Sequence, residues 1–357
     1  MPVSGRTDLQ LPLLYIDLTV VGLSAVADEV WAVGYERWPG PALIWHSVGG
    51  EPWQRTSYSG SSEPVYTQLS GVHATTSGDV WAVGSDQVPY RPLILHGDGM
   101  TWQPVESPDS VDGQTLSDVA AWGRDDAFAV GVRYPPLSAP HGLLDATLWD
   151  ILAIRWDGAR WAAVPGLGHG RLSGVCAVGP GAYWAVGSAP AATRAGRFAL
   201  VAHYADEQWQ QVGPEVAGAL ADVAATGPDD VWAVGSDWDP THPPGPLILH
   251  YDGHAWSPAD IPAIGEDAHL LAVACGGRDN VWAVGSTELS NGFTGPFIMH
   301  FDGSAWAVVE PPATAAGRLE DVIVLPSGEA WGAGKASPGV SVGGSSIPLV
   351  ISTEGRR

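Results

Sequence analysis

The sequence predicts an all-β protein: a single β-propeller of seven four-stranded blades that spans residues 1–357. The segment VWAVG or a close variant recurs along the whole chain, and its spacing matches the roughly 40 to 50 residues of a four-stranded blade. Its aromatic residue falls at Trp31, Trp81, Phe128, Trp184, Trp232, Trp282 and Trp331, so that successive copies are 50, 47, 56, 48, 50 and 49 residues apart. With 46 Gly and 30 Pro, the chain is also interrupted too often for long helices.

Each repeat reads as four strands. A first strand of the pattern L-x-x-V-x-A is followed by a Gly/Asp turn, the VWAVG strand, a variable loop, a third strand such as PLILH, a tight DG turn and a fourth strand that opens with Trp. The predicted blades lie at about residues 21–59, 66–107, 114–165, 170–214, 218–262, 268–311 and 317–357.

The last repeat contains only three strands before the chain ends. The apolar segment at residues 10–20 precedes the first strand of the first repeat and has no other role in this scheme. We therefore expect residues 10–20 to supply the outer strand of the seventh blade, because such closure removes an exposed sheet edge.

Residues that recur once per repeat are interpreted as packing. The Trp residues that open the fourth strands are expected to wedge between blades. They are Trp53, Trp102, Trp161, Trp209, Trp256 and Trp306. Five histidines recur at the end of the third strand and are interpreted as hydrogen-bonded turn anchors, since the rotation of the propeller separates them. They are His46, His96, His203, His250 and His300.

The tight turns YDGHAW and FDGSAW occupy the place of the Asp-box of sialidase-like propellers and resemble a degenerate form of it. Asp and Gly are adjacent here rather than separated, and no RIP segment supplies the arginine of a sialidase site. The resemblance therefore implies the propeller fold without sialidase chemistry. The Gly-Gly pair of kelch repeats and the terminal Trp-Asp of WD repeats do not recur.

The charge of the chain argues against two classes of partner, and its cysteines argue against a disulfide. The formal net charge is −23, with 16 basic against 39 acidic residues, which argues against nucleic acid and against an anionic membrane surface. The two cysteines, Cys176 and Cys275, fall on non-adjacent blades, so we expect no mutual disulfide. No signal peptide or transmembrane segment is recognised, and a cytoplasmic location is expected.

The loops between the second and third strands, and between each blade and the next, are long and irregular. They open on one side of the propeller, here called the variable face, where binding sites are expected. The residue before the Leu of each first strand should ring the channel mouth on this face. These residues are Gly22, Gln68, Thr115, Arg171, Ala219, His269 and Arg318.

Arg171, His269 and Arg318, with Gln68 in the same ring, predict a site for a carboxylate or phosphate. The alternative is that the basic residues pair with neighbouring acids, namely Glu266, Asp267 and Glu320. Two residues beyond each Leu, Asp118, Asp222 and Asp321 occur on alternate blades. They would either bind a divalent cation on the axis or form a ring of solvated carboxylates.

Three Trp residues in the variable loops lie outside the repeat, namely Trp38, Trp149 and Trp238. They suit stacking on a sugar or planar ligand, with loop packing as the alternative. His169 and His141 are expected near Arg171, and His242 near His269. His269, His242 and His141 are candidate acid–base residues.

No motif indicates a cofactor, a nucleophile elbow or a phosphate loop. The predicted function is recognition of a small, anionic or glycan-like ligand at the channel mouth on the variable face. One alternative is an enzyme of lyase, cyclase or isomerase type that uses the same mouth. A scaffold for protein–protein interaction is the other, because propellers serve all three purposes.

Overall fold

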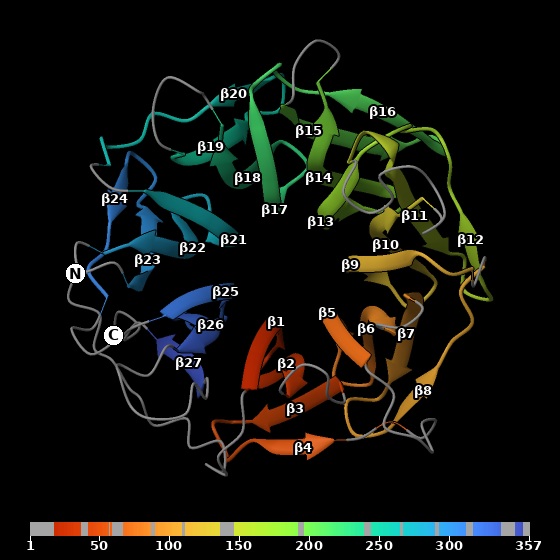
Figure 1. Cartoon of the computed structure of the whole chain (residues 1–357). Coiled ribbons are helices and arrows are strands. Elements are labelled where there is room, and N and C mark those ends of the chain that lie inside the picture. The colour runs from red at the N-terminus through yellow and green to blue at the C-terminus, as the bar shows by residue number, and fades with distance from the viewer. Residues whose placement is uncertain are drawn as a thin grey trace.

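The protein is a ring of β-sheets around a central opening (Figure 1). The computed structural model describes residues 18–36, 42–56, 58, 67–86, 90–108, 111–135, 146–191, 196–238, 244–264, 267–289, 293–311, 317–336 and 347–352. Within these ranges the only helical element is the 3-10 turn η2 (Ala146–Leu148), and no helix is long and apolar enough to cross a membrane.

Each sheet is an antiparallel meander whose first strand lies nearest the axis. The inner strands are β1 (Leu18–Val26), β5 (Thr67–Thr76), β9 (Gln114–Gly123), β13 (Arg171–Gly179), β17 (Gly218–Gly227), β21 (Ala268–Gly277) and β25 (Gly317–Val324). The second strands are β2 (Glu29–Glu36), β6 (Asp79–Asp86), β10 (Asp126–Arg133), β14 (Ala182–Pro190), β18 (Asp230–Asp237), β22 (Asn280–Glu288) and β26 (Ala330–Ala336).

The third strands are β3 (Ala42–Val48), β7 (Arg91–Gly97), β11 (Asp150–Trp156), β15 (Arg197–Ala205), β19 (Pro246–Tyr251), β23 (Thr294–Phe301) and β27 (Ile347–Ser352). The outer strands are β4 (Gln54–Thr56), β8 (Trp102–Pro104), β12 (Trp161–Ala163), β16 (Gln208–Val212), β20 (Trp256–Pro258) and β24 (Trp306–Val308). We number the blades 1 to 6 from β1–β4 to β21–β24, and call β25-β26-β27 the closing sheet.

The prediction of seven four-stranded blades is wrong. The described residues form six four-stranded blades, and the closing sheet, with three strands, packs between blade 6 and blade 1. The predicted closing strand is also wrong for Leu18, Thr19 and Val20, because these residues pair with β2 as part of the inner strand of blade 1. Residues 10–17 lie outside the described residues.

The register of blade 1 explains this error. Val20 pairs with Gly34 just as Leu69 pairs with Gly84 in blade 2, so Val20 and not Leu23 is the counterpart of the repeated Leu. The counterpart of Gln68 at the channel mouth is therefore Thr19 rather than Gly22.

The core consists of the interfaces between neighbouring blades. The aromatic side chain of one second strand meets, edge to face, the Trp that opens the outer strand of the next blade. The ring centroids are 5.2 Å apart for Trp81 and Trp161, and 5.2 Å apart for Trp184 and Trp256. The expected role of these Trp residues as inter-blade wedges is confirmed.

Four of the five repeated histidines make the predicted hydrogen bond, namely His46, His96, His250 and His300. His203 stacks on Trp184, but Ala182 stands where the other blades have the hydrogen-bond partner. In blade 5, His250 stacks on Trp232 with 3.9 Å between ring centroids, and its Nε2 lies 2.7 Å from Asp230 Oδ1 at the start of β18. His96 has the same two contacts, with Trp81 and Asp79. The imidazole thus fastens the end of the third strand to the beginning of the second.

Replacing His250 by alanine is expected to lower the free energy of unfolding by about 1 to 3 kcal/mol, because Asp230 loses its partner in a half-buried site. Urea denaturation of the variant would measure the loss. His254→Ala is the matched control, because this histidine is exposed in the following turn. Equal stability of both variants would contradict the structural role.

The DG turns between third and outer strands are built by the aspartate. Asp252 Oδ1 accepts hydrogen bonds from the backbone N–H groups of His254 and Ala255, both at 2.9 Å, and Gly253 has a φ of 90°. Asp302 makes the same bonds in blade 6, and a hydrogen bond from the Ser304 hydroxyl, together with these backbone bonds, lowers the pKa of its carboxyl to about 2. The turns thus need Asp and Gly for their own geometry.

Candidate functional site

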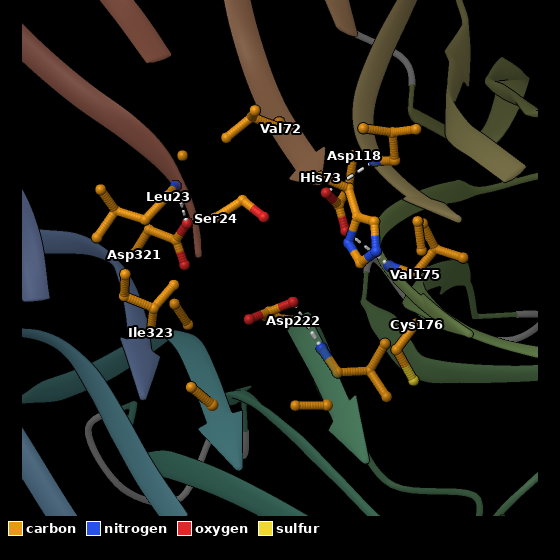
Figure 2. A pocket seen from close by; sticks show the side chains of 18 of the residues that line it. Leu23, Ser24, Val72, His73, Asp118, Val175, Cys176, Asp222, Asp321 and Ile323 are labelled. Atoms are coloured by element: carbon orange, nitrogen blue, oxygen red, sulfur yellow. Dashed lines mark hydrogen bonds between the residues drawn. The ribbon is translucent and has the colours of Figure 1, made fainter. Parts of the chain in front are cut away.

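The inner strands enclose a channel with a cavity of about 610 Å³. Because each inner strand begins at the variable face, Ser70, Ser117 and Glu320 line the channel near that face, and Thr75, Trp122 and Val324 line its other end. Figure 2 shows the part between them, with Asp118, Asp222 and Asp321 on different strands around the opening.

The three aspartates connect neighbouring blades. The second oxygen of each carboxylate accepts a backbone N–H from the next inner strand: Asp118 Oδ2 from Val175 at 2.9 Å, and Asp222 Oδ2 from Val273 at 2.8 Å. Asp321 connects in the same way to β1 of blade 1 (Figure 2). Among the described residues, no group of three or more His, Cys, Asp or Glu side chains could hold a metal ion.

Burial raises the pKa of all three carboxyls. The pKa of Asp118 rises to about 7, with the charge of Asp222 as a second cause, and that of Asp222 rises to about 6. The pKa of Asp321 is also raised by burial and by the charge of Asp222. His73 faces the same channel, and burial lowers the pKa of its imidazole.

The three basic residues predicted at the mouth, Arg318, His269 and Arg171, lie in three local groups. Arg318 forms an ion pair with Glu320, two residues along β25, as the alternative interpretation expected. His269 contacts Ser236 and Asp267 between blades 5 and 6. Gln68 is half-buried on β5, opposite Ser85.

Arg171 belongs to the third group, which lies at the start of blade 4. Its neighbour is Arg197, the first residue of β15, and burial, with the charge of Arg171 as a second cause, lowers the pKa of Arg197. The guanidinium of Arg197 lies over the indole of Trp149, 4.8 Å from the ring centroid, and donates to Ser188 Oγ at 3.2 Å. We call Arg171, Arg197 and Trp149 the arginine cluster.

The arginine cluster contains two like charges, and neither arginine forms an ion pair with a carboxylate of the described residues. Arg171 Nε is buried and has no hydrogen-bond partner among the described residues. Asp150, which follows Trp149 in the chain, lies 2.8 Å from His169 Nδ1. Like charges that share a half-buried site raise its energy, and a bound anion would offset this cost.

Three predicted residues cannot be placed. Trp38, His141 and His242 lie outside the described residues. Trp238 follows β18 and is 43% exposed. Cys176 and Cys275 are free thiols on β13 and β21, and burial raises the pKa of both.

Sequence reasoning missed Arg197 and Ser236. Arg197 lies two residues before Ala199, which stands where other repeats have the Pro of PLILH, so Arg197 falls outside the repeated segment and the pattern gave no signal for it. Ser236 belongs to the recurring VWAVGS segment and was therefore interpreted as packing.

Comparison with solved structures places this geometry among known folds. YCF48 bound to D1 peptide matches with a TM-score of 0.62 and 15% identity, over 99% of this chain and 95% of that chain. YCF48 from Cyanidioschyzon merolae matches with a TM-score of 0.60 and 13% identity, over 98% of both chains. The fucose-specific lectin from Aleuria aurantia, in its Hg-derivative form, matches with a TM-score of 0.50 and 13% identity, over 88% of this chain and 100% of that chain.

The chain is a β-propeller. At 15% identity and below, these similarities show the fold alone. No protein-family model and no curated protein matches the sequence.

Proposed function

We propose that this propeller is a recognition protein that binds an acidic peptide through the arginine cluster on its variable face. The observation that carries the proposal is the pair of arginines, Arg171 and Arg197, with a lowered pKa at Arg197 and an unpartnered buried Nε at Arg171. A peptide carboxylate would accept hydrogen bonds from a planar guanidinium, which matches its geometry in a bidentate manner.

The surroundings of the cluster support a peptide over an enclosed small molecule. Trp149 offers an aromatic ring beside the charges and packs against Tyr134, with 5.2 Å between ring centroids. The neighbouring His169 and Asp150 are more than half exposed, so the site is open to an extended ligand. Two propellers of similar structure bind a peptide and fucose respectively, which are the two kinds of ligand under consideration.

Selection from a phage-displayed random peptide library would test the proposal. Selected peptides should be enriched in Asp and Glu, and their affinity should fall tenfold or more in Arg171→Ala and in Arg197→Ala. One charge-assisted hydrogen bond is worth roughly 1.5 to 3 kcal/mol, and 1.4 kcal/mol is a tenfold change in Kd. Lysine at either position should restore only part of the affinity, because it lacks the bidentate fork.

Arg160→Ala is the control, since Arg160 is exposed in the turn before β12, on the opposite side of the propeller. Fluorescence anisotropy with a labelled selected peptide would give the Kd of each variant. Peptides that bind wild type and both arginine variants equally would refute the proposal. If no peptide is enriched and the protein binds sugars on a glycan array, the ligand is a sugar and the peptide proposal is refuted.

A further inference from the structure

A serine, a histidine and an aspartate lie next to one another between blades 5 and 6. Ser236 Oγ is 2.8 Å from His269 Nδ1, and the other ring nitrogen, Nε2, is 3.2 Å from Asp267 Oδ1. Asp267 Oδ1 is buried and accepts no hydrogen bond from the described residues, so its contact with His269 is a charge pair and not a hydrogen bond. The three residues come from the end of β18 and from the start of β21.

The fold fixes these positions. Ser236 is held in β18 by its pairing with Ala219 on one side and Pro246 on the other, and His269 pairs with Ser286. The backbone carbonyl of Asp267 accepts hydrogen bonds from Glu288 N at 2.9 Å and Thr287 Oγ1 at 3.0 Å. The segment that carries the carboxylate is therefore anchored to blade 6.

The arrangement is the one that activates a nucleophile. A neutral imidazole accepts a proton on one ring nitrogen, so Nδ1 can take the Ser236 proton. The negative charge of Asp267, 3.2 Å from Nε2, would stabilise the imidazolium that forms.

The group is also accessible. The side chains of His269 and Asp267 are 37% and 36% exposed, and Ser236 is half-buried. Trp238 lies two residues after Ser236, just past the end of β18, and its exposed indole offers an apolar surface near the site.

We propose that Ser236, His269 and Asp267 form a catalytic site that hydrolyses carboxylic esters, separate from the arginine cluster. Ser236 Oγ attacks the ester carbonyl carbon as its proton passes to His269 Nδ1, and the tetrahedral adduct collapses when the C–O bond to the alcohol breaks. The alcohol leaves with the proton from His269. Water, deprotonated by His269, then attacks the acyl-serine, releasing the acid and returning the proton to Ser236.

Covalent labelling of the wild-type protein tests the nucleophile directly. A fluorophosphonate probe should modify one residue, identified as Ser236 by peptide mass mapping, and His269→Gln should abolish the labelling. Ser85→Ala, the corresponding position of blade 2, is the matched control and should label like wild type. Arg171→Ala should also label normally, which separates this site from the peptide site.

Hydrolysis of p-nitrophenyl acetate gives the second readout. We expect the hydrolysis rate, measured above the buffer blank, to fall about 10²- to 10⁴-fold in Ser236→Ala and in His269→Gln. This is the usual contribution of a general base. Asp267→Asn tests a positioning residue and should lower kcat while leaving KM unchanged. Thermal melting would establish that each variant is folded.

Two results would overturn the site. One is a wild-type protein that neither labels nor hydrolyses the ester above the blank. The other is labelling or turnover that Ser236→Ala retains, since the reacting group would then lie elsewhere. The first result needs only the wild-type protein, and the second needs only a folded Ser236→Ala variant.

Discussion

Replacing Gly84 by alanine is expected to lower the free energy of unfolding by about 3 kcal/mol or more, although the added group is one methyl. A Cβ at Gly84 would lie 1.9 Å from the carbonyl oxygen of Gln68 and 2.8 Å from Leu69 Cα. The inner strand carries an irregularity between Leu69 and Gly71, which presses its backbone against β6 at this point. Both obstacles are backbone atoms, so no rotation of a side chain can relieve the clash.

Gly78→Ala provides the matched control in the same blade, because a Cβ there meets nothing within 4 Å. We expect it to leave the stability unchanged or to raise it slightly, by reducing the freedom of the unfolded chain. Urea denaturation of the two variants would measure the difference. A Gly84→Ala protein as stable as Gly78→Ala would show that the close approach of β5 and β6 is not required.

The same contact explains why glycine follows the valine of each repeat. In blade 5, a Cβ at Gly235 would lie 2.0 Å from the carbonyl oxygen of Ala219, and in blade 4 one at Gly187 would lie 2.0 Å from that of Arg171. The pattern predicted a propeller because it records a steric requirement that every blade shares. Packing between blades is repetitive in the same way, so the roles of the repeated Trp and His residues could be predicted as well.

The blade count and the first register could not be predicted by counting repeats. Leu23 precedes Trp31 by 8 residues, whereas Leu69 precedes Trp81 by 12, and this shorter spacing shows that Leu23 is not the repeated Leu. Aligning blade 1 on Leu23 left Leu18 to Val20 unassigned, and so they were placed in the wrong strand.

The candidate site depends on side-chain neighbours that a repeat pattern does not contain. The position of Arg171 at the start of an inner strand was predictable, but its neighbour Arg197 lies 26 residues later, on the third strand of the same blade. Ser236 and His269 come from different blades, and only the assembled interface joins them. Sequence reasoning therefore identified Arg171 and His269 but not their partners, Arg197 and Ser236.

The carboxyls of the channel predict an unusual dependence of stability on pH. The folded-state pKa values of Asp118 and Asp222, about 7 and about 6, exceed the ordinary value of 3.8. Between about pH 4 and pH 7 the folded protein therefore binds more protons than the unfolded chain, and its stability falls as pH rises through this window. One pKa unit corresponds to about 1.4 kcal/mol, so the expected loss is on the order of several kcal/mol.

Asp222→Asn tests this origin of the slope. Asparagine keeps one oxygen acceptor but has no charge to bury, so the decline in stability between pH 4 and pH 7 should become shallower. The amide cannot accept both the Val223 and the Val273 N–H, so the variant should also be less stable than wild type at pH 4. Urea denaturation at intervals of half a pH unit would separate this constant loss from the change in slope.

Asp302→Asn is the control, because folding lowers the pKa of Asp302 whereas it raises the pKa of Asp222. The Asp302 carboxyl is held at a pKa of about 2 by the hydrogen bonds of the DG turn, so it is ionised in both states above pH 5 and contributes no slope there. Its variant should follow the wild-type decline between pH 5 and pH 7. If Asp222→Asn also follows it unchanged, the carboxylates that join the blades are not the groups that take up the protons, and the slope must come from elsewhere in the chain.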